Sequence, residues 1–332
     1  MGAFEAQMIN AIDQSKLPRM RASRMRPTLT VAISTVADRW ENAEMVAQSL
    51  RNQDVDQILV IIQKCNDTTI QLLAGNRNNS SYSIVADREM GLSRSRNIAI
   101  EKTRSDYVWT VDDDVEIVPQ ACARIKELVA SPNDVIYLAR VGNRDDVGSY
   151  TRPRKKGRIG WLYLCRANSI ELILPVKEIG KRQLRFDTRI GLGTTFPTGE
   201  ENLFLLNAVS LGMQVVDLGE TLIRHPKIAT PSKINRKDDE RRWQVRGHIA
   251  SKFGPPIAFA LGIRWCARRF FNADFITACR NLLRGYKCKT VNVLTGIPDS
   301  YEENGRCEYM RMGPVEVVFG DRVEKISKPQ IR

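Results

Sequence analysis

The sequence has 332 residues and a formal net charge of +13, with 42% hydrophobic and 27% charged residues. These values fit one large globular domain or two small ones, and they exclude a low-complexity or disordered chain. No apolar run approaches the ~18 residues of a membrane-spanning helix, and the N-terminus lacks the apolar core and cleavage site of a secretory signal. Seven cysteines without a Cys-x-x-Cys pair argue against a disulfide framework or a zinc cage and favour a cytoplasmic protein.

The first half of the chain alternates between strand and helix patterns, after a polar and basic arm over residues 1–27. Apolar runs at 29–36, 58–62, 82–86 and 107–111 predict strands, and the segments between them predict helices. The uninterrupted apolar run at 58–62 is typical of a parallel strand covered on both faces. We therefore expect an α/β fold, with a doubly wound, mostly parallel sheet flanked by helices.

Three consecutive aspartates, Asp112, Asp113 and Asp114, follow the fourth predicted strand. Adjacent like charges repel one another, and a divalent cation such as Mg²⁺ or Mn²⁺ would neutralise them while also binding the phosphates of a substrate. Open α/β sheets bind their ligands at the carboxyl ends of strands, where these residues lie. The alternative is an exposed acidic turn.

The end of the first predicted strand, from Ser34 onward, is not followed by the G-x-G-x-x-G fingerprint of dinucleotide sites. A nucleotide could still bind there, with Asp38 or Asp67 accepting hydrogen bonds from a base or ribose. Arg94 and Arg96 lie at the start of a predicted helix. Guanidinium groups and free backbone N–H groups together suit a diphosphate, although a surface helix with solvated arginines is the alternative.

The next part of the chain contains a basic loop, Arg152–Arg158, between predicted strands at 135–139 and 159–165. We expect this loop to act as a lid. Glu200 and Glu201 begin a predicted helix, where they either complement the helix dipole or supply a general base. Predicted strands at 215–218 and 222–223 then lead to His225, one of two histidines in the chain.

The last third of the chain is strongly basic, with 16 Lys or Arg against four Asp or Glu between Leu222 and Thr290. A helix is predicted over Lys237–Phe253. Apolar residues then recur at helical spacing, with basic residues on other faces, through 255–289. Such an amphipathic segment can lie on an anionic membrane surface, or it can pack on its own domain with a solvated basic face.

The order of these motifs resembles glycosyltransferase family 2, whose members are inverting, nucleotide-sugar-dependent enzymes with the GT-A fold, and especially its bacterial surface-polysaccharide enzymes. The motifs that carry the resemblance are Gly91–Ala99, Asp112–Asp114, Arg185–Asp187, Gly191–Gly193, Gly199–Glu201 and His225. The resemblance implies a GT-A domain over residues 28–254, with its Rossmann-like sheet. The arm at 1–27 would precede it, and a basic amphipathic helical extension at 255–289 and a tail at 290–332 would follow.

The resemblance also implies roles for the aspartates. Asp112–Asp114 is similar to the family's DxD motif, in which Asp114 would bind the cation. Asp112 would contact the donor or the cation, and Asp113 would lie beside the donor. His225 matches a histidine that can join the metal.

Further site residues follow from the same resemblance. Arg96 would lie near the diphosphate or the donor sugar, and Asp67 near a uracil-type base. Ser34 and Asp38, at the end of the first predicted strand, remain candidates for nucleotide binding by their position alone. The family usually has Gly-Glu-Asp where this chain has Gly199-Glu200-Glu201, so Glu201 takes the position of the general base, with Glu200 as the alternative.

The resemblance implies transfer of a sugar from a nucleotide donor, most readily a UDP-sugar, to a hydroxyl of a glycan or lipid-linked acceptor. The cysteine usage favours the cytoplasm, and the basic amphipathic segment suggests peripheral attachment to the inner face of the plasma membrane. A nucleotidyltransferase is an alternative, but it should have a glycine-rich basic loop after the first strand, which Ser34–Arg39 does not supply. A nucleic-acid-binding protein is another, but no nucleic-acid motif is present, and no nucleic-acid partner is expected.

Overall fold

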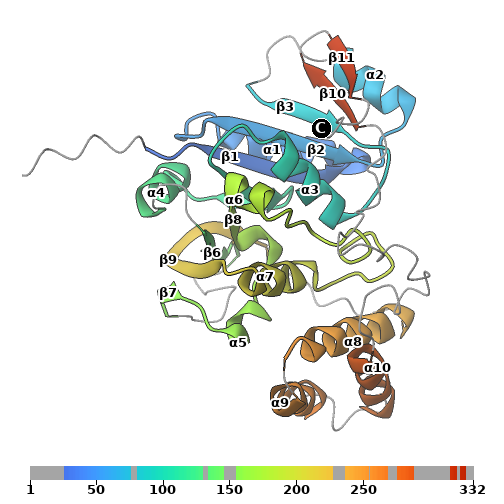
Figure 1. The fold of residues 1–332 in the computed structure, drawn as a ribbon. Helices are drawn as coiled ribbons and strands as arrows, with labels where there is room; N and C mark the ends of the chain where they lie inside the picture. Colours follow the sequence, from blue (N-terminus) through green and yellow to red (C-terminus); the bar gives the residue numbers. More distant parts are fainter. Residues whose placement is uncertain are drawn as a thin grey trace, which may run out of the picture.

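The computed structural model describes residues 26–75, 81–129, 134–145, 155–226, 236–253, 255–267, 275–287, 315–319 and 322–326 (Figure 1). Most of the predicted arm at 1–27 and of the tail at 290–332 therefore lies outside the described residues. So do residues 152–154 of the expected lid.

A mixed, mostly parallel β-sheet forms the centre of the molecule, as the alternating pattern predicted (Figure 1). Its order is β11-β10-β3-β2-β1-β4-β8-β6-β9-β5, with β7 paired to β9. The four N-terminal strands are parallel, and they are β1 (Leu29–Val36), β2 (Gln57–Gln63), β3 (Ser83–Ala86) and β4 (Tyr107–Asp112). The helices that connect them are α1 (Trp40–Ser49), after a short 3₁₀ turn, α2 (Asp67–Gly75) and α3 (Leu92–Lys102).

The second half of the sheet mixes parallel and antiparallel pairs. Its strands are β5 (Glu116–Ile117), β6 (Val135–Asn143), β7 (Gly157–Arg158), β8 (Leu172–Pro175) and β9 (Gln214–His225). The accompanying helices are α4 (Ala121–Leu128), α5 (Trp161–Leu164), α6 (Val176–Lys181) and α7 (Glu200–Ser210). β8 lies antiparallel between β4 and β6, whereas β6 and β9 are parallel.

Two strand predictions in this half need correction. The expected strand at 159–165 is wrong, because after Ile159 the chain turns into helix α5; a short apolar run does not distinguish a strand from a buried helical turn. The two expected strands at 215–218 and 222–223 are parts of one strand, β9, which is irregular around Gly219, a glycine at φ +81°.

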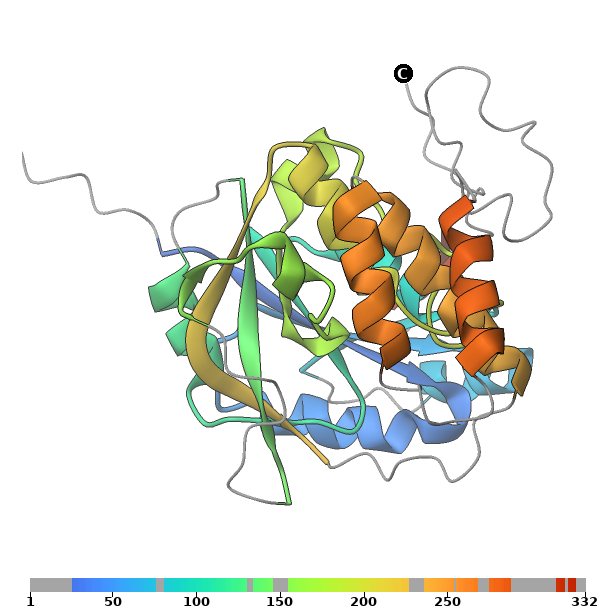
Figure 2. The ribbon, with the colours of Figure 1, turned by 90° about the horizontal axis from the view of Figure 1, so that it is seen from below.

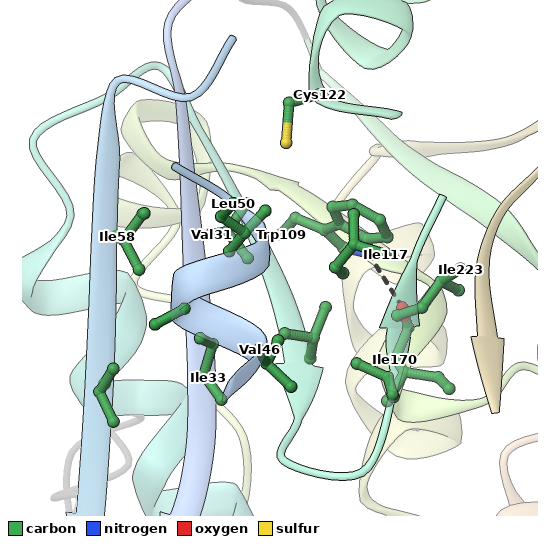
Figure 3. Packing of buried hydrophobic residues seen from close by; sticks show 14 of the residues in the cluster. Val31, Ile33, Val46, Leu50, Ile58, Trp109, Ile117, Cys122, Ile170 and Ile223 are labelled. Carbon is green, nitrogen blue, oxygen red and sulfur yellow. Dashed lines mark hydrogen bonds between the residues drawn. The ribbon is translucent and has the colours of Figure 1, made fainter. Parts of the chain in front are cut away.

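The hydrophobic core consists of two layers, one on each face of the sheet. Helices α1, α2 and α4 cover one face, and α3, α6 and α7 cover the other. Because side chains alternate along a strand, Val31 and Trp109 point into the first layer and Ala32 and Val108 into the second. Trp109 is fully buried, and its indole N–H donates a hydrogen bond of 3.0 Å to the carbonyl oxygen of Ile170 (Figure 3). This packing fixes β4 three residues before the aspartates.

Three C-terminal helices form a separate layer below α7 (Figures 1 and 2). They are α8 (Arg236–Ser251), α9 (Pro255–Ala267) and α10 (Phe275–Lys287). α8 and α10 cross at two glycines, where a Cβ atom at Gly285 would lie 1.8 Å from the carbonyl oxygen of Gln244 and one at Gly247 would lie 2.0 Å from that of Leu282. The region predicted as one amphipathic segment thus contains two helices.

A short antiparallel hairpin near the C-terminus, β10 (Val315–Phe319) and β11 (Arg322–Ile326), extends the sheet beyond β3. Among the described helices, none has the length and apolarity that crossing a bilayer requires.

Candidate active site

The three consecutive aspartates diverge at the carboxyl end of β4. Asp112 is the last residue of the strand and lies opposite Ser34, near the end of β1. Asp113 and Asp114 occupy the turn that leads to β5. The turn directs the three carboxylates to different partners, so each has its own role.

Asp114 faces the end of β9. Its Oδ1 lies 3.2 Å from Nε2 of His225, and this oxygen has no well-aligned hydrogen bond within the described part of the chain. The contact with His225 lowers the pKa of Asp114 and raises the pKa of the imidazole. A carboxylate and an imidazole, from chain segments more than 100 residues apart, thus meet at one point of the sheet edge.

This pair fits part of a divalent-cation site. Two ligands at right angles on an ion with bonds of ~2.1 Å lie about 3.0 Å apart, and oxygen and nitrogen donors suit Mn²⁺ or Mg²⁺. Within the described ranges, no group of three or more His, Cys, Asp or Glu residues is arranged to hold a metal. Asp114 and His225 would therefore supply two ligands, and substrate phosphates and water would supply the others.

Asp113 joins the ends of two strands. Its side chain is only 6% exposed, and it accepts hydrogen bonds of 2.5 Å from both Thr35 Oγ1 and Arg39 Nη2. Arg39 also lies 3.6 Å from Asp114. Thr35 and Arg39 were not among the predicted site residues. A basic residue three positions after the first strand could have indicated Arg39. Asp113 thus braces the site in this structure.

Arg96 lies between Asp112 at the end of β4 and Glu200 at the start of α7. It is 1% exposed, and its Nη1 donates a hydrogen bond of 3.0 Å to Glu200 Oε1. Its Nη2 lies 3.8 Å from Asp112 Oδ1 and has no hydrogen-bond partner among the described residues. The guanidinium also lies over the ring of Phe186, at 5.7 Å from its centre. A buried guanidinium that has an unused N–H donor can bind a further anionic group.

Helix α3 holds its other polar residues in internal contacts. Arg94, which the sequence grouped with Arg96, forms a buried two-point ion pair with Asp87, at 2.6 and 3.1 Å. Ser95 shares a hydrogen bond of 2.7 Å with Ser34, which is buried. Arg94 therefore anchors the helix, and of the two arginines Arg96 belongs to the site.

Glu200 and Glu201 begin α7 after Gly199, whose φ of +94° is in the left-handed region. A Cβ at Gly199 would lie 2.7 Å from Val245 of α8, so this position needs a glycine for both conformation and space. Glu200 is buried against Arg96. Burial and the neighbouring Glu200 charge raise the pKa of Glu201 well above its usual value.

The environment of Asp112 also disfavours its charge. Burial raises the pKa of this carboxyl to about 6, and the nearby Asp114, Asp113 and Glu200 add to the effect, while Arg96 opposes it. Carboxyl groups with raised pKa values in a cleft are typical of catalytic and binding sites.

Asp38 and Asp67 lie at the rim, beyond the ends of β1 and β2. Both side chains are 78% exposed. Asp38 lies 3.5 Å from Lys64, and Asp67 accepts a hydrogen bond from Arg88. The sheet therefore brings Ser34, Asp112, Asp114, Arg96, Glu200, Glu201 and His225 to one edge, with Asp38 and Asp67 further out.

Comparisons with known proteins identify the family and support the fold. The family model described as "Glycosyl transferase family 2" matches residues 30–196, half of the chain. Solved structures of TarS from S. aureus share the fold. TarS 1–349 in complex with UDP-GlcNAc has 16% identity and a TM-score of 0.53, covering 91% of this chain and 99% of that chain. TarS 1–349 alone has 14% identity and a TM-score of 0.51, with the same coverage.

The longer TarS structure has 16% identity and a TM-score of 0.51 and covers 90% of this chain, which spans 60% of that protein. A search of curated proteins found no match. The family match includes most of β1, Arg96 and the three aspartates, whereas Glu200, Glu201 and His225 lie beyond its end. The chain belongs to glycosyl transferase family 2 and is a glycosyltransferase that uses a nucleotide-sugar donor.

Proposed function

We propose that this enzyme transfers the sugar with inversion to a hydroxyl group of a glycan or lipid-linked acceptor, with a divalent cation assisting departure of the nucleoside diphosphate. The observation that carries the proposal is the position of Arg96, which contacts Glu200 at 3.0 Å and approaches Asp112 at 3.8 Å. Arg96 thus links the end of β4, which would hold the donor, to the start of α7, which would supply the base.

The diphosphate of the donor would lie between Asp114, His225 and Arg96. A bound Mg²⁺ or Mn²⁺ would neutralise charge that develops on the leaving diphosphate. The unused Nη2 of Arg96 would donate to the same group or to the sugar. Asp112, whose carboxyl faces Arg96, would accept hydrogen bonds from the ribose or sugar, and Asp113 would keep β1 and β4 in register.

Glu201 is our choice for the general base. Glu200 is buried, and its Oε1 is already engaged by Arg96 at 3.0 Å. Glu201 is half-buried and has a raised pKa, two properties of a carboxylate that takes a proton near neutral pH. It would take the acceptor proton while the acceptor oxygen bonds to the anomeric carbon and the bond to the nucleoside diphosphate breaks.

The donor is best sought first among UDP-sugars, because the fold likeness includes a TarS structure with UDP-GlcNAc. Ser34, Asp38 and Asp67 would line the nucleoside end of the site. We place the enzyme in the cytoplasm, since free cysteines at five described positions suit a reducing compartment.

Calorimetric titration of UDP and GDP, with and without Mn²⁺, tests this proposal. We expect metal-dependent binding of one nucleotide, at least about tenfold weaker in Asp114→Ala and unchanged in Glu41→Gln, an exposed acid on α1. Equal binding by wild type and Asp114→Ala would overturn the metal-assisted mechanism. A panel of nucleotide sugars, followed by analysis of the anomeric configuration of the product, then identifies the donor and tests inversion.

A further inference from the structure

Helices α9 and α10 leave an apolar groove of about 640 Å³ between them. Phe259, Ile263 and Cys266 line it from α9, and Cys279 and Leu283 line it from α10. α8 packs against α10 through the glycine crossing, and the layer formed by α8, α9 and α10 lies below α7, on the side away from the central sheet (Figure 1).

Large apolar side chains along these helices are exposed. Phe259 is 72% and Ile276 70% exposed, and Ile263 and Leu283 are each more than half exposed. Phe259, Ile263 and Leu283 line the same groove and so form one apolar surface, whereas single exposed apolar residues are common on soluble proteins.

Basic residues lie next to this surface on the same helices. On α10, Ile276, Cys279, Leu283 and Tyr286 recur at intervals of three or four residues and form one stripe, and Arg280, Arg284 and Lys287 form the adjacent stripe. On α9, Arg264 follows Ile263. The two helices contain no acidic residue. An exposed apolar stripe bordered by cations is the pattern of helices that lie in a membrane interface.

We propose that the α9–α10 surface is a docking site for a bilayer that contains anionic phospholipid. The apolar side chains around the groove enter the acyl region, and Arg264, Arg280 and Lys287 contact the phosphate groups. Charge complementarity selects this occupant, because a second copy of the chain would bring the same positive charges together, whereas an anionic headgroup layer attracts them.

The position of this surface gives it a link to the active site. α8 contacts α10 at Gly285 and also contacts Gly199, the residue before the two glutamates. One helix therefore connects the membrane-facing layer to the proposed base.

Vesicle co-sedimentation of the full chain tests the proposal without donor, metal or activity, so its failure is separate from any failure of the proposed function. The vesicles are phosphatidylcholine alone or mixed with phosphatidylglycerol. One variant, Phe259→Ser with Leu283→Ser, removes two exposed apolar side chains. A second, Arg280→Glu with Lys287→Glu, reverses two charges, and its matched control, Arg51→Glu with Lys177→Glu, makes the same change in net charge on exposed residues elsewhere.

We expect wild-type protein to bind the anionic vesicles at low salt and to bind neutral vesicles at least about tenfold less. Both α9–α10 variants should lose about tenfold or more, with melting temperatures within a few degrees of wild type, while the control variant should bind like wild type. Failure of the wild type to bind would overturn the proposal. An equal loss of vesicle binding in the control variant would also overturn it. So would the finding that the protein is a dimer, if Phe259→Ser with Leu283→Ser dissociates this dimer but leaves vesicle binding unchanged.

Discussion

Asp114 Oδ1 and His225 Nε2 lie 3.2 Å apart, although the two residues belong to distant parts of the chain. A proton or a metal ion can occupy the space between them. The hydrogen bond to the Asp114 carboxylate raises the pKa of the imidazole and so favours the proton, whereas a metal ion requires the neutral imidazole. The two occupants therefore compete.

Replacing His225 by Ala should weaken Mn²⁺ binding in the presence of UDP by roughly tenfold or more, since one of two protein ligands is lost. The wild-type affinity should also fall as the pH is lowered through the raised pKa of His225, and the variant should lose most of this dependence. Calorimetry or the Mn²⁺ paramagnetic resonance signal measures both effects. Identical pH profiles for the two proteins would remove His225 from the metal site.

Asp112→Asn should stabilise the metal-free protein at pH 7 while it abolishes transfer. The folded-state pKa of about 6 lies above the unfolded value, so the charged form is disfavoured in the fold. That cost is complete above pH 6 and disappears as the pH falls below the unfolded value of about 3.9. We expect a gain of roughly 1 to 2 kcal/mol at pH 7, after allowance for partial exposure, and a much smaller one at pH 4. Thermal unfolding at the two pH values measures the difference; a gain of the same size at both would show another origin.

Glu201→Gln and Glu200→Gln should have different kinetic effects. If Glu201 takes the acceptor proton, its amide variant should lose about 10²- to 10⁴-fold in kcat with little change in donor affinity. The wild-type kcat should fall as the pH is lowered through the raised pKa of this group. Glu200→Gln should instead weaken donor binding, because Arg96 would lose the ion pair that holds its guanidinium in place. Steady-state kinetics with a nucleotide titration separate the two patterns, and the reverse result would assign the base to Glu200.

Gly285→Ala should destabilise the helical layer by more than about 2 kcal/mol or displace α10, since its Cβ would overlap the carbonyl oxygen of Gln244. Gly180→Ala is the matched control, because Gly180 lies in helix α6 and a Cβ there meets nothing within 4 Å. That control should be neutral or slightly stabilising. Chemical denaturation of both variants, followed by helix content, checks the difference.

The sequence predicted the first four strands and their helices well, because each combines a clear periodicity with local turn signals. It failed at 159–165, where seven residues carry too little pattern to separate strand from helix. Nor could it place β8 antiparallel between β4 and β6, since pairing depends on contacts far apart in the chain.

Individual contacts within the site were less predictable than its location. The order of the motifs predicted that the aspartates, Arg96 and the glutamates lie at one edge of the sheet, because parallel strands end on the same side. Which carboxylate faces which cation depends on the turn after β4. Arg94 and Arg96 look alike in sequence, yet one is held by Asp87 and the other by Glu200. The partners that distinguish them, Asp87 and Glu200, lie 7 and 104 residues away in the sequence, so only the fold shows which arginine meets which carboxylate.

The hairpin formed by β10 and β11 has a consequence for biosynthesis. It covers the outer edge of β3, yet it leaves the ribosome more than 200 residues later. Until then, the unpaired backbone N–H and C=O groups of β3 are available to other nascent chains. Proteolysis or early termination before Val315 would recreate this open edge, and the shortened products would be prone to aggregate.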